Sequence, residues 1–191
     1  MRKKTKSSGI IKTGIVLFLI TGIAALILAS VNSVTAPMIA ENETKKQMTA
    51  MTTVLPDAEK FDELADVAKD NGILGIYEGK KADETVGYAV LVESMGYGGA
   101  ISMVVGVDLE DKITGIDITS QSETPGLGAN CTKDEFKNQF TGKTSEITVV
   151  KSNSKDNQID AMTSATITSK AVTKGVNAAV DAVKAIEGGN E

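Results

Sequence analysis

Three hydroxyl side chains occur within four positions of one short segment near the C-terminus. Small residues between them leave the backbone open to close approach, and an apolar pattern that predicts a helix from about Ile167 follows directly. Free N–H groups and the positive dipole end at a helix start favour a phosphate. Hydroxyl residues before a helix are also common N-caps, and an aspartate there can form a turn. The segment therefore predicts a phosphate-binding site or an ordinary helix cap; it reads Asp160-Ala161-Met162-Thr163-Ser164-Ala165-Thr166.

A second segment is rich in turn-forming residues. Pro125 and Gly126 suit the two central positions of a type II turn, and Gly128 keeps the following backbone permissive. Such a loop can lie flat against a planar ligand, although it also fits an ordinary turn between elements. The full segment reads Glu123-Thr124-Pro125-Gly126-Leu127-Gly128.

A third segment, Gly96-Tyr97-Gly98-Gly99, separates two expected strands. Its glycines permit a hairpin or a bulge. Tyr97 either stacks on a ring or seals the edge of a core. The segment is not a GxGxxG fingerprint, and the chain contains no Walker sequence.

Residue types missing from the chain exclude several kinds of chemistry. There is no histidine, which removes Ser-His-Asp catalysis and histidine-ligated metal sites, and we expect no metal centre. Cys131 is the only cysteine, so the chain alone forms neither a disulfide nor a CxxC redox pair, and we expect a small buried side chain. After residue 40 the chain carries 15 lysines against 25 acidic residues, which argues against nucleic-acid binding.

The N-terminal segment has the features of a membrane anchor. Residues 13–31 are uncharged and mostly apolar, long enough to cross a hydrocarbon core of roughly 30 Å. Five basic residues and no acid lie in residues 1–40, which predicts a cytoplasmic N-terminus and an outer domain. A cleaved signal peptide is the alternative; its apolar core is usually shorter, and Pro37 directly follows the best cleavage site.

Coarse patterns predict the remaining organisation. We expect a cytoplasmic start (1–12), a transmembrane helix (13–35), a helical connection (36–56) that begins at Pro37, and one domain (57–191). Residues 57–84 read as irregular, and 132–140 as a short helix capped by Thr132. A long helix from Ile167 ends at Gly188-Gly189. This pattern predicts an α+β domain with a mainly antiparallel sheet, whose expected strands are 85–94, 100–108, 112–119 and 146–151.

The three motifs GYGG, ETPGLG and DAMTSAT occur in that order behind a basic start and one apolar span. This combination resembles the G subunit of Rnf-type complexes, the ion-pumping ferredoxin:NAD⁺ oxidoreductases. It is also similar to the C subunit of sodium-pumping NADH:quinone oxidoreductases. The resemblance covers nearly the whole chain. It implies that FMN is held as a phosphoester on the last threonine of the family's S/T-G-A-T segment, which is Thr166 here.

The resemblance also implies further site residues. Asp160 and Thr163 match the flavin transferase recognition pattern Asp-x-x-Ser/Thr-x-x-Thr. Ser164 stands where the family usually has glycine, and Gln121 stands where many relatives have histidine, which puts a proton-handling role there in doubt. The residues expected near the flavin are Ser164, Ala165, Glu123, Thr124, Gly126, Leu127, Gly128, Tyr97 and Gly98.

The implied function is electron transfer within a membrane complex that couples ferredoxin and NAD⁺ to Na⁺ or H⁺ translocation. The implied partners are integral membrane subunits, iron–sulfur and flavin subunits, and a flavin transferase, because an alkyl hydroxyl without a base is a weak nucleophile. The implied location is the cell (inner) membrane, crossed once. Three alternatives stay open: a C-type quinone-reductase subunit, a free-standing extracytoplasmic flavoprotein, and a non-redox membrane-anchored binding module.

Overall fold

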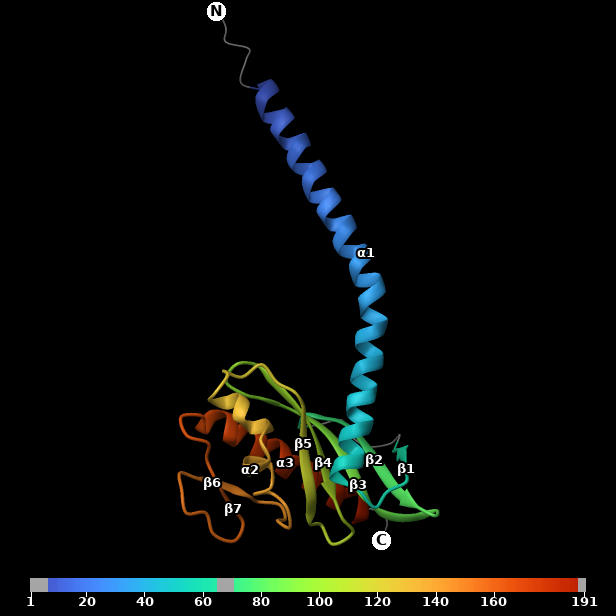
Figure 1. The fold of residues 1–191 in the computed structure, drawn as a ribbon, viewed down its shortest axis with the longest axis vertical. Coiled ribbons are helices and arrows are strands. Elements are labelled where there is room, and N and C mark those ends of the chain that lie inside the picture. Colours follow the sequence, from blue (N-terminus) through green and yellow to red (C-terminus); the bar gives the residue numbers. More distant parts are fainter. Residues whose placement is uncertain (1–6, 65–70, 189–191) are drawn as a thin grey trace, which may run out of the picture. The chain divides into compact units, whose positions relative to one another are not determined.

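The protein is described from a computed structural model, which covers residues 7–64 and 71–188. The chain divides into two compact units, Met1–Lys45 and Lys46–Glu191. The described part of the first unit is helical, and the second contains the end of the same helix, the strands and the remaining helices. The expected α+β class is therefore confirmed (Figure 1).

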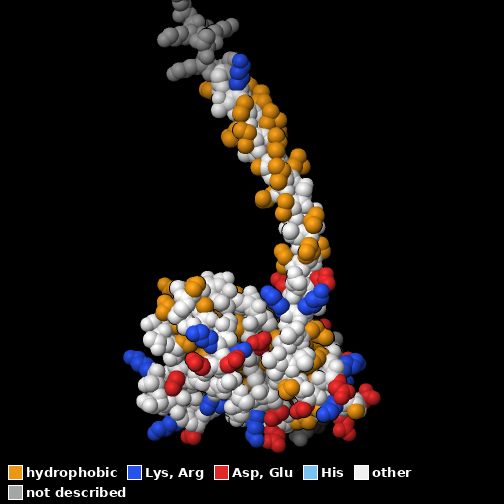
Figure 2. All heavy atoms as spheres, viewed as in Figure 1, with side chains coloured by type: hydrophobic (Ala, Val, Ile, Leu, Met, Phe, Trp, Pro, Cys, Tyr) orange, Lys and Arg blue, Asp and Glu red, His pale blue; other side chains and the backbone are white. Residues whose placement is uncertain are grey.

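Helix α1 runs from Ser7 to Val54 without interruption. It is long and apolar enough to cross a membrane by length and composition, and its large apolar side chains between Ile10 and Ile39 are exposed (Figure 2). The expectation that a new helix begins at Pro37 is wrong, because Pro37 lies inside α1. A proline within a helix removes one backbone hydrogen bond, and membrane helices tolerate this loss.

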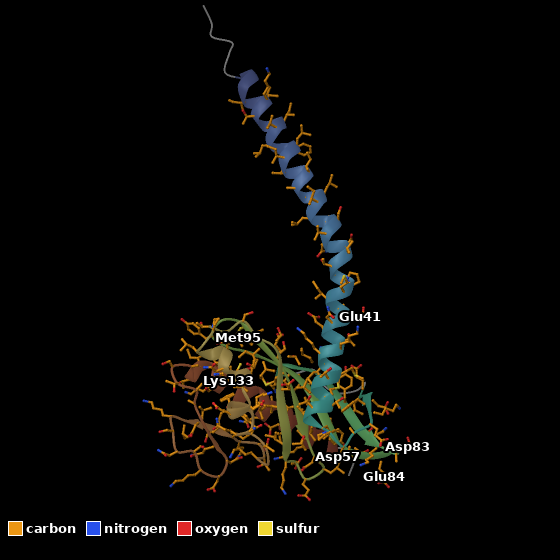
Figure 3. The ribbon with its side chains drawn as sticks, in the orientation of Figure 1. Glu41, Asp57, Asp83, Glu84, Met95 and Lys133 are labelled. Carbon is orange, nitrogen blue, oxygen red and sulfur yellow. The ribbon has the colours of Figure 1, made fainter. Side chains whose placement is uncertain are left out.

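The second unit is built around a five-stranded antiparallel meander in the order β1-β2-β3-β4-β5. Glu84 and Met95, the first and last residues of β3, mark opposite ends of the sheet (Figure 3). The expected strands at 85–94, 100–108 and 112–119 are confirmed, whereas the irregular reading of 57–84 is wrong for β1 and β2. The strands are β1 Lys60–Glu63, β2 Ile73–Lys81, β3 Glu84–Met95, β4 Ala100–Val107 and β5 Ile113–Ser120.

Both faces of the sheet are covered, which explains the long apolar runs in β3 and β4. Alternate side chains point to opposite faces of a strand. Val90, Val92, Met103 and Val105 belong to the larger core, which includes the apolar stripe of α3 (Thr166–Glu187). Ala89, Leu91 and Val104 belong to a second core with residues 50–55 at and just beyond the end of α1.

The segment between β5 and α3 is mostly loops and short elements. The 3-10 helix η1 spans Gly128–Thr132, and α2 spans Asp134–Lys137. The expected capping by Thr132 is wrong, because Thr132 ends η1 and donates its hydroxyl to the carbonyl of Ala129 at 3.0 Å. Strand β6 (Thr148–Val150) lies within the expected strand, and it pairs in parallel with the unexpected β7 (Gln158–Asp160).

Candidate functional site

The turn at Thr124–Leu127 has the geometry that its sequence predicts. The N–H of Leu127 donates to the carbonyl of Thr124 at 3.1 Å, with Pro125 and Gly126 at the central positions. Gly126 has a φ of +78°, which side chains other than glycine rarely adopt. The side-chain amide of Asn130 donates to the carbonyl of Gly126 at 2.9 Å and so fixes the turn against η1.

The Gly96–Gly99 segment is the hairpin loop between β3 and β4. The N–H of Gly96 donates to the carbonyl of Gly99 at 2.8 Å, and Met95 pairs with Ala100 at the strand ends. None of its three glycines lies in the left-handed φ region. Two of them are required for space: a Cβ at Gly96 would overlap the Glu123 carboxylate, and a Cβ at Gly98 would overlap the carbonyl of Ser122.

Glu123 is buried between these two loops and α3, with 6% of its surface exposed. Its Oε1 accepts the N–H of Gly98 at 2.8 Å, and its Oε2 accepts the hydroxyl of Thr168 at 2.6 Å. Its own N–H donates to the side-chain carbonyl of Gln121 at 2.6 Å. Gln121 therefore holds the loop in shape.

The Thr163–Thr166 segment folds as a turn that leads into α3. The N–H of Ala165 donates to the carbonyl of Met162 at 3.0 Å, and Ser164 has a φ of +60° at the third position. A positive φ at that position is what makes glycine common in such turns. Ser164 therefore occupies a backbone conformation that suits glycine better than serine.

Helix α3 begins at Thr166, one residue earlier than expected, and lacks a side-chain cap. Its N-cap residue is Ala165, so the hydroxyls of Thr163, Ser164 and Thr166 do not cap it. Thr166 is exposed, and its hydroxyl has no hydrogen-bond partner within residues 7–64 and 71–188. The helix-cap interpretation of this segment therefore fails, and the hydroxyl next to the first free N–H groups of α3 is available for another use.

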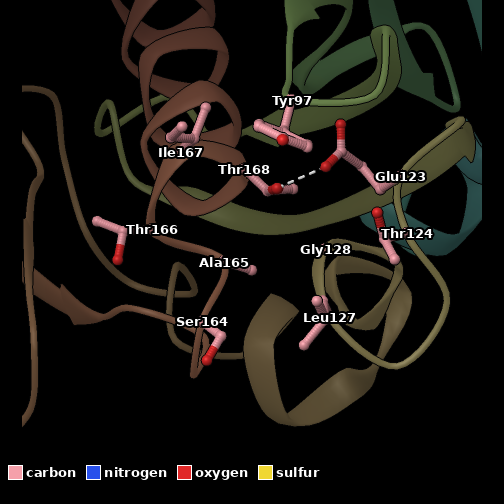
Figure 4. Close-up of a pocket in the computed structure, with 10 residues that line it drawn as sticks. All are labelled: Tyr97, Glu123, Thr124, Leu127, Gly128, Ser164, Ala165, Thr166, Ile167 and Thr168. Carbon is pink, nitrogen blue, oxygen red and sulfur yellow. Dashed lines mark hydrogen bonds between the residues drawn. The ribbon is translucent and has the colours of Figure 1, made fainter.

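These segments enclose a pocket of about 480 Å³ (Figure 4), within the range of small-molecule sites. The first turn of α3 forms one side and the turn after Glu123 forms the other. Ile167 and Thr168 also line it, although neither was among the expected site residues. The lining residues are Tyr97, Glu123, Thr124, Leu127, Gly128, Ser164, Ala165, Thr166, Ile167 and Thr168.

Four of the expected site residues do not line the pocket: Asp160, Thr163, Gly98 and Gly126. Asp160 ends β7, where its carboxylate accepts the N–H of Ser154 at 2.7 Å and its own N–H donates to the side chain of Gln139 at 2.7 Å. Thr163 is exposed on the turn before α3. Gly98 and Gly126 shape the two loops through backbone contacts, as described above.

Beside the pocket, the Cys131 thiol is affected by burial and, to a smaller extent, by Glu123. Burial raises the pKa of the Cys131 thiol to about 11, and the nearby negative charge of Glu123 adds to that shift. Cys131 is fully buried, as expected, and is therefore a poor nucleophile. Within the described ranges, no group of three or more His, Cys, Asp or Glu side chains could hold a metal ion.

Known protein families match both units. Residues 96–181 match the FMN-binding domain family, and residues 1–54 match the RnfG N-terminal region. The chain is 44% identical over 168 residues to the G subunit of the proton-translocating ferredoxin:NAD(+) oxidoreductase complex of Clostridium ljungdahlii. That alignment covers 87% of this chain and 88% of the relative. The chain belongs to the family of Rnf-complex G subunits.

A second relative and a solved structure agree with this assignment. The chain is 39% identical over 187 residues to the G subunit of the Na(+)-translocating ferredoxin:NAD(+) oxidoreductase complex of Acetobacterium woodii, in an alignment that covers 90% of each chain. The crystal structure of the C subunit of the Na(+)-translocating NADH-quinone reductase of Parabacteroides distasonis superposes with a TM-score of 0.55 at 20% identity. It covers 74% of this chain and 92% of that one, and it supports the fold. Membership of the Rnf family makes the chain a component of an ion-translocating oxidoreductase with an FMN-binding domain.

Proposed function

We propose that Thr166 carries FMN through a phosphoester bond and that the chain is the electron-carrying subunit of a complex that transfers electrons between ferredoxin and NAD⁺. The position of Thr166 supports this attachment site. Thr166 is the first residue of α3 and lines the pocket, and its side chain is exposed and does not cap the helix. The residues present fit this cofactor. The small side chain of Ala165 leaves room in the wall, and the pocket of about 480 Å³ has the size of a small-molecule site.

Each part of the pocket has a role in this proposal. A phosphate on Thr166 would be held by the first N–H groups of α3, whose dipole stabilises a negative charge by about 0.3–1 kcal/mol. This contribution is small, so the covalent bond retains the cofactor and the helix end orients it. Tyr97, Leu127 and Ile167 are the exposed apolar side chains of the pocket and offer surfaces for an aromatic ring. When bound, the flavin supplies the electron-transfer chemistry that these side chains lack.

Attachment requires a second protein in this proposal. A threonine hydroxyl needs a base to become a good nucleophile. The chain has no histidine, and no base contacts the Thr166 hydroxyl within the described residues. Thr163 and Asp160 lie outside the pocket, Thr163 on the exposed turn, which suits recognition by an external flavin transferase better than contact with the ring.

The place of this chain in its complex follows from its relatives. Their names describe ferredoxin:NAD(+) oxidoreductase complexes that translocate protons or Na⁺. We infer the same coupling here, with integral membrane subunits and iron–sulfur or flavin subunits as partners and α1 as a single-pass anchor in the cell membrane. A C-type quinone-reductase subunit is the weaker candidate, because its likeness rests on fold at 20% identity, against 44% over most of the chain for the Rnf relative.

Mass spectrometry of the protein co-expressed with a flavin transferase tests the attachment. Trypsin releases residues 156–170, and this peptide should be heavier by one FMN minus one water, with the adduct on Thr166. Thr166→Ala should fold normally but lose the flavin fluorescence that survives denaturation. Thr163→Ala, the matched control, should keep the adduct on Thr166 at a lower yield. An adduct on Thr163 or Ser164, or an unmodified wild-type peptide, would contradict the proposal.

A further inference from the structure

Glu123 is the one acidic side chain among the residues that line the pocket. Its oxygens contact two segments far apart in the sequence: Gly98 is 25 residues before it and Thr168 is 45 residues after it. No ion pair involves Glu123 within the described parts of the chain, so the two hydrogen bonds are its only direct compensation there. A buried charge without a cation is expensive, and its presence here calls for an explanation.

Two glycines make room for this carboxylate. A Cβ at Gly96 would overlap Oε1, and a Cβ at Gly128 would overlap Oε2. Neither glycine has a left-handed φ, so the turn conformation alone does not require glycine at these positions. The hairpin loop after β3 and the start of η1 are therefore shaped around the Glu123 side chain.

We propose that Glu123 is a positioning residue that holds the Gly96–Gly99 hairpin against the first turn of α3 and places a negative charge in the pocket wall. This proposal rests on the function proposed above. The first consequence is structural: Tyr97 on the hairpin and Thr166 on α3 are held apart at a fixed separation before any flavin is attached. The second is electrostatic: a fixed negative charge disfavours a flavin that gains negative charge on reduction, and so lowers its midpoint potential.

Substitutions at Glu123 separate the two consequences. In Glu123→Gln, the amide oxygen can accept the N–H of Gly98 and the amide nitrogen can donate to the Thr168 hydroxyl, so the connection persists without the charge. Glu123→Ala removes both the connection and the charge. Thr168→Val keeps the charge but breaks the bond to α3. Thr173→Val is the matched control: Thr173 is also a buried threonine of α3, but it donates within the helix, to the carbonyl of Ser169 at 2.8 Å.

The structural part is tested by hydrogen exchange in the full chain in detergent, with Thr166→Ala present in every sample so that no flavin is attached. Exchange at the Gly98 amide should be faster by about tenfold or more in Glu123→Ala, the change expected when a bond to a charged group is lost. Thr168→Val should accelerate it less, and Glu123→Gln and Thr173→Val should leave it near the starting rate. Equal exchange in Glu123→Ala and its parent would overturn the positioning role.

The electrostatic part is tested by redox titration of the flavinylated full chain. The midpoint potential of Glu123→Gln should rise above that of the wild type, while that of Thr173→Val should not move. An unchanged potential in Glu123→Gln would overturn the charge effect. If the wild type carries no covalent flavin, the proposed function fails instead, and the exchange measurements still decide whether Glu123 holds the hairpin to the helix.

Discussion

The hydroxyl of Ser169 accepts a hydrogen bond from the N–H of Met162 at 3.0 Å and donates one to the carbonyl of Ala165 at 3.0 Å. Ser169 is fully buried in the first turns of α3, so this side chain fastens the preceding turn onto the helix. Thr163 and Ser164 are exposed on this turn, and Thr166 is exposed as the first residue of the helix that follows it. The hydroxyl of Thr166, the proposed attachment point, is thereby accessible while its backbone is held in place.

Ser169→Ala should reduce flavinylation without moving the modification. The substitution leaves the half-buried N–H of Met162 without its partner, which costs about 0.5–1.5 kcal/mol. The loop before Thr166 should then become more variable, so the transferase should modify a smaller fraction of the protein. Thr173→Val, which removes only a bond inside the helix, should flavinylate normally. In-gel flavin fluorescence against total protein measures the yield; equal yields for the two variants would contradict the role given to Ser169.

Ser164→Gly and Gly126→Ala should shift stability in opposite directions. Ser164 has a φ of +60°, a left-handed conformation that costs a side-chain-bearing residue about 1–2 kcal/mol. Glycine relieves this strain but adds freedom to the unfolded chain, so we expect a net gain of about 0.5–1 kcal/mol. At Gly126, with φ +78°, an added Cβ would contact nothing within 4 Å, so a loss of about 1 kcal/mol would be purely conformational. Denaturant unfolding of the full chain in detergent measures both; changes of the same sign would refute this account.

The sequence predicted the central strands well because their residues carry the signal locally. β3 and β4 are rich in β-branched and apolar residues, and both faces of these strands are buried. β2 was missed because its glycines and charged residues read as irregular. Its Gly79 packs directly against Leu55, where a Cβ would overlap the leucine side chain. A glycine that weakens a strand locally is thus required by packing with a residue 24 positions away.

The site was predictable to the extent that it is encoded in short motifs. The turn at Pro125-Gly126, the hairpin at Gly96–Gly99 and the small residues before α3 could each be recognised locally. The hydrogen bonds of Glu123 could not be predicted in this way, because its partners come from two distant segments. Thr168 was missed for the same reason: its role is visible only once α3 is placed beside the turn after Glu123.

The membrane orientation is tested with single cysteines and a membrane-impermeant maleimide in whole cells freed of wall or outer membrane. Lys12→Cys marks the basic end of α1, and Lys133→Cys marks an exposed position of the domain (Figure 3). We expect labelling of Lys133→Cys alone, because basic residues stay in the cytoplasm. The native Cys131 should stay silent, since its raised pKa of about 11 leaves almost no thiolate at neutral pH. Both variants should be labelled in broken cells. Labelling of Lys12→Cys alone in whole cells would show that the orientation is the opposite of the one expected.

Gly96→Ala and Gly99→Ala should separate the spatial role of the hairpin glycines from their flexibility. Both residues lie in one four-residue loop, and neither has a left-handed φ. At Gly96 a methyl group would overlap the Glu123 carboxylate and approach Ile101 Cδ1 at 2.7 Å, so overpacking should destabilise the domain by about 1–3 kcal/mol. At Gly99 the nearest atom is Ser122 Cβ at 3.6 Å, an ordinary contact, so stability should hold within about 0.5 kcal/mol.

Gly96→Ala should also alter the visible spectrum of the bound flavin, because the displaced carboxylate lines its pocket, whereas Gly99→Ala should not. Equal effects of the two substitutions would mean that the loop needs glycine for flexibility and that Glu123 does not dictate its shape.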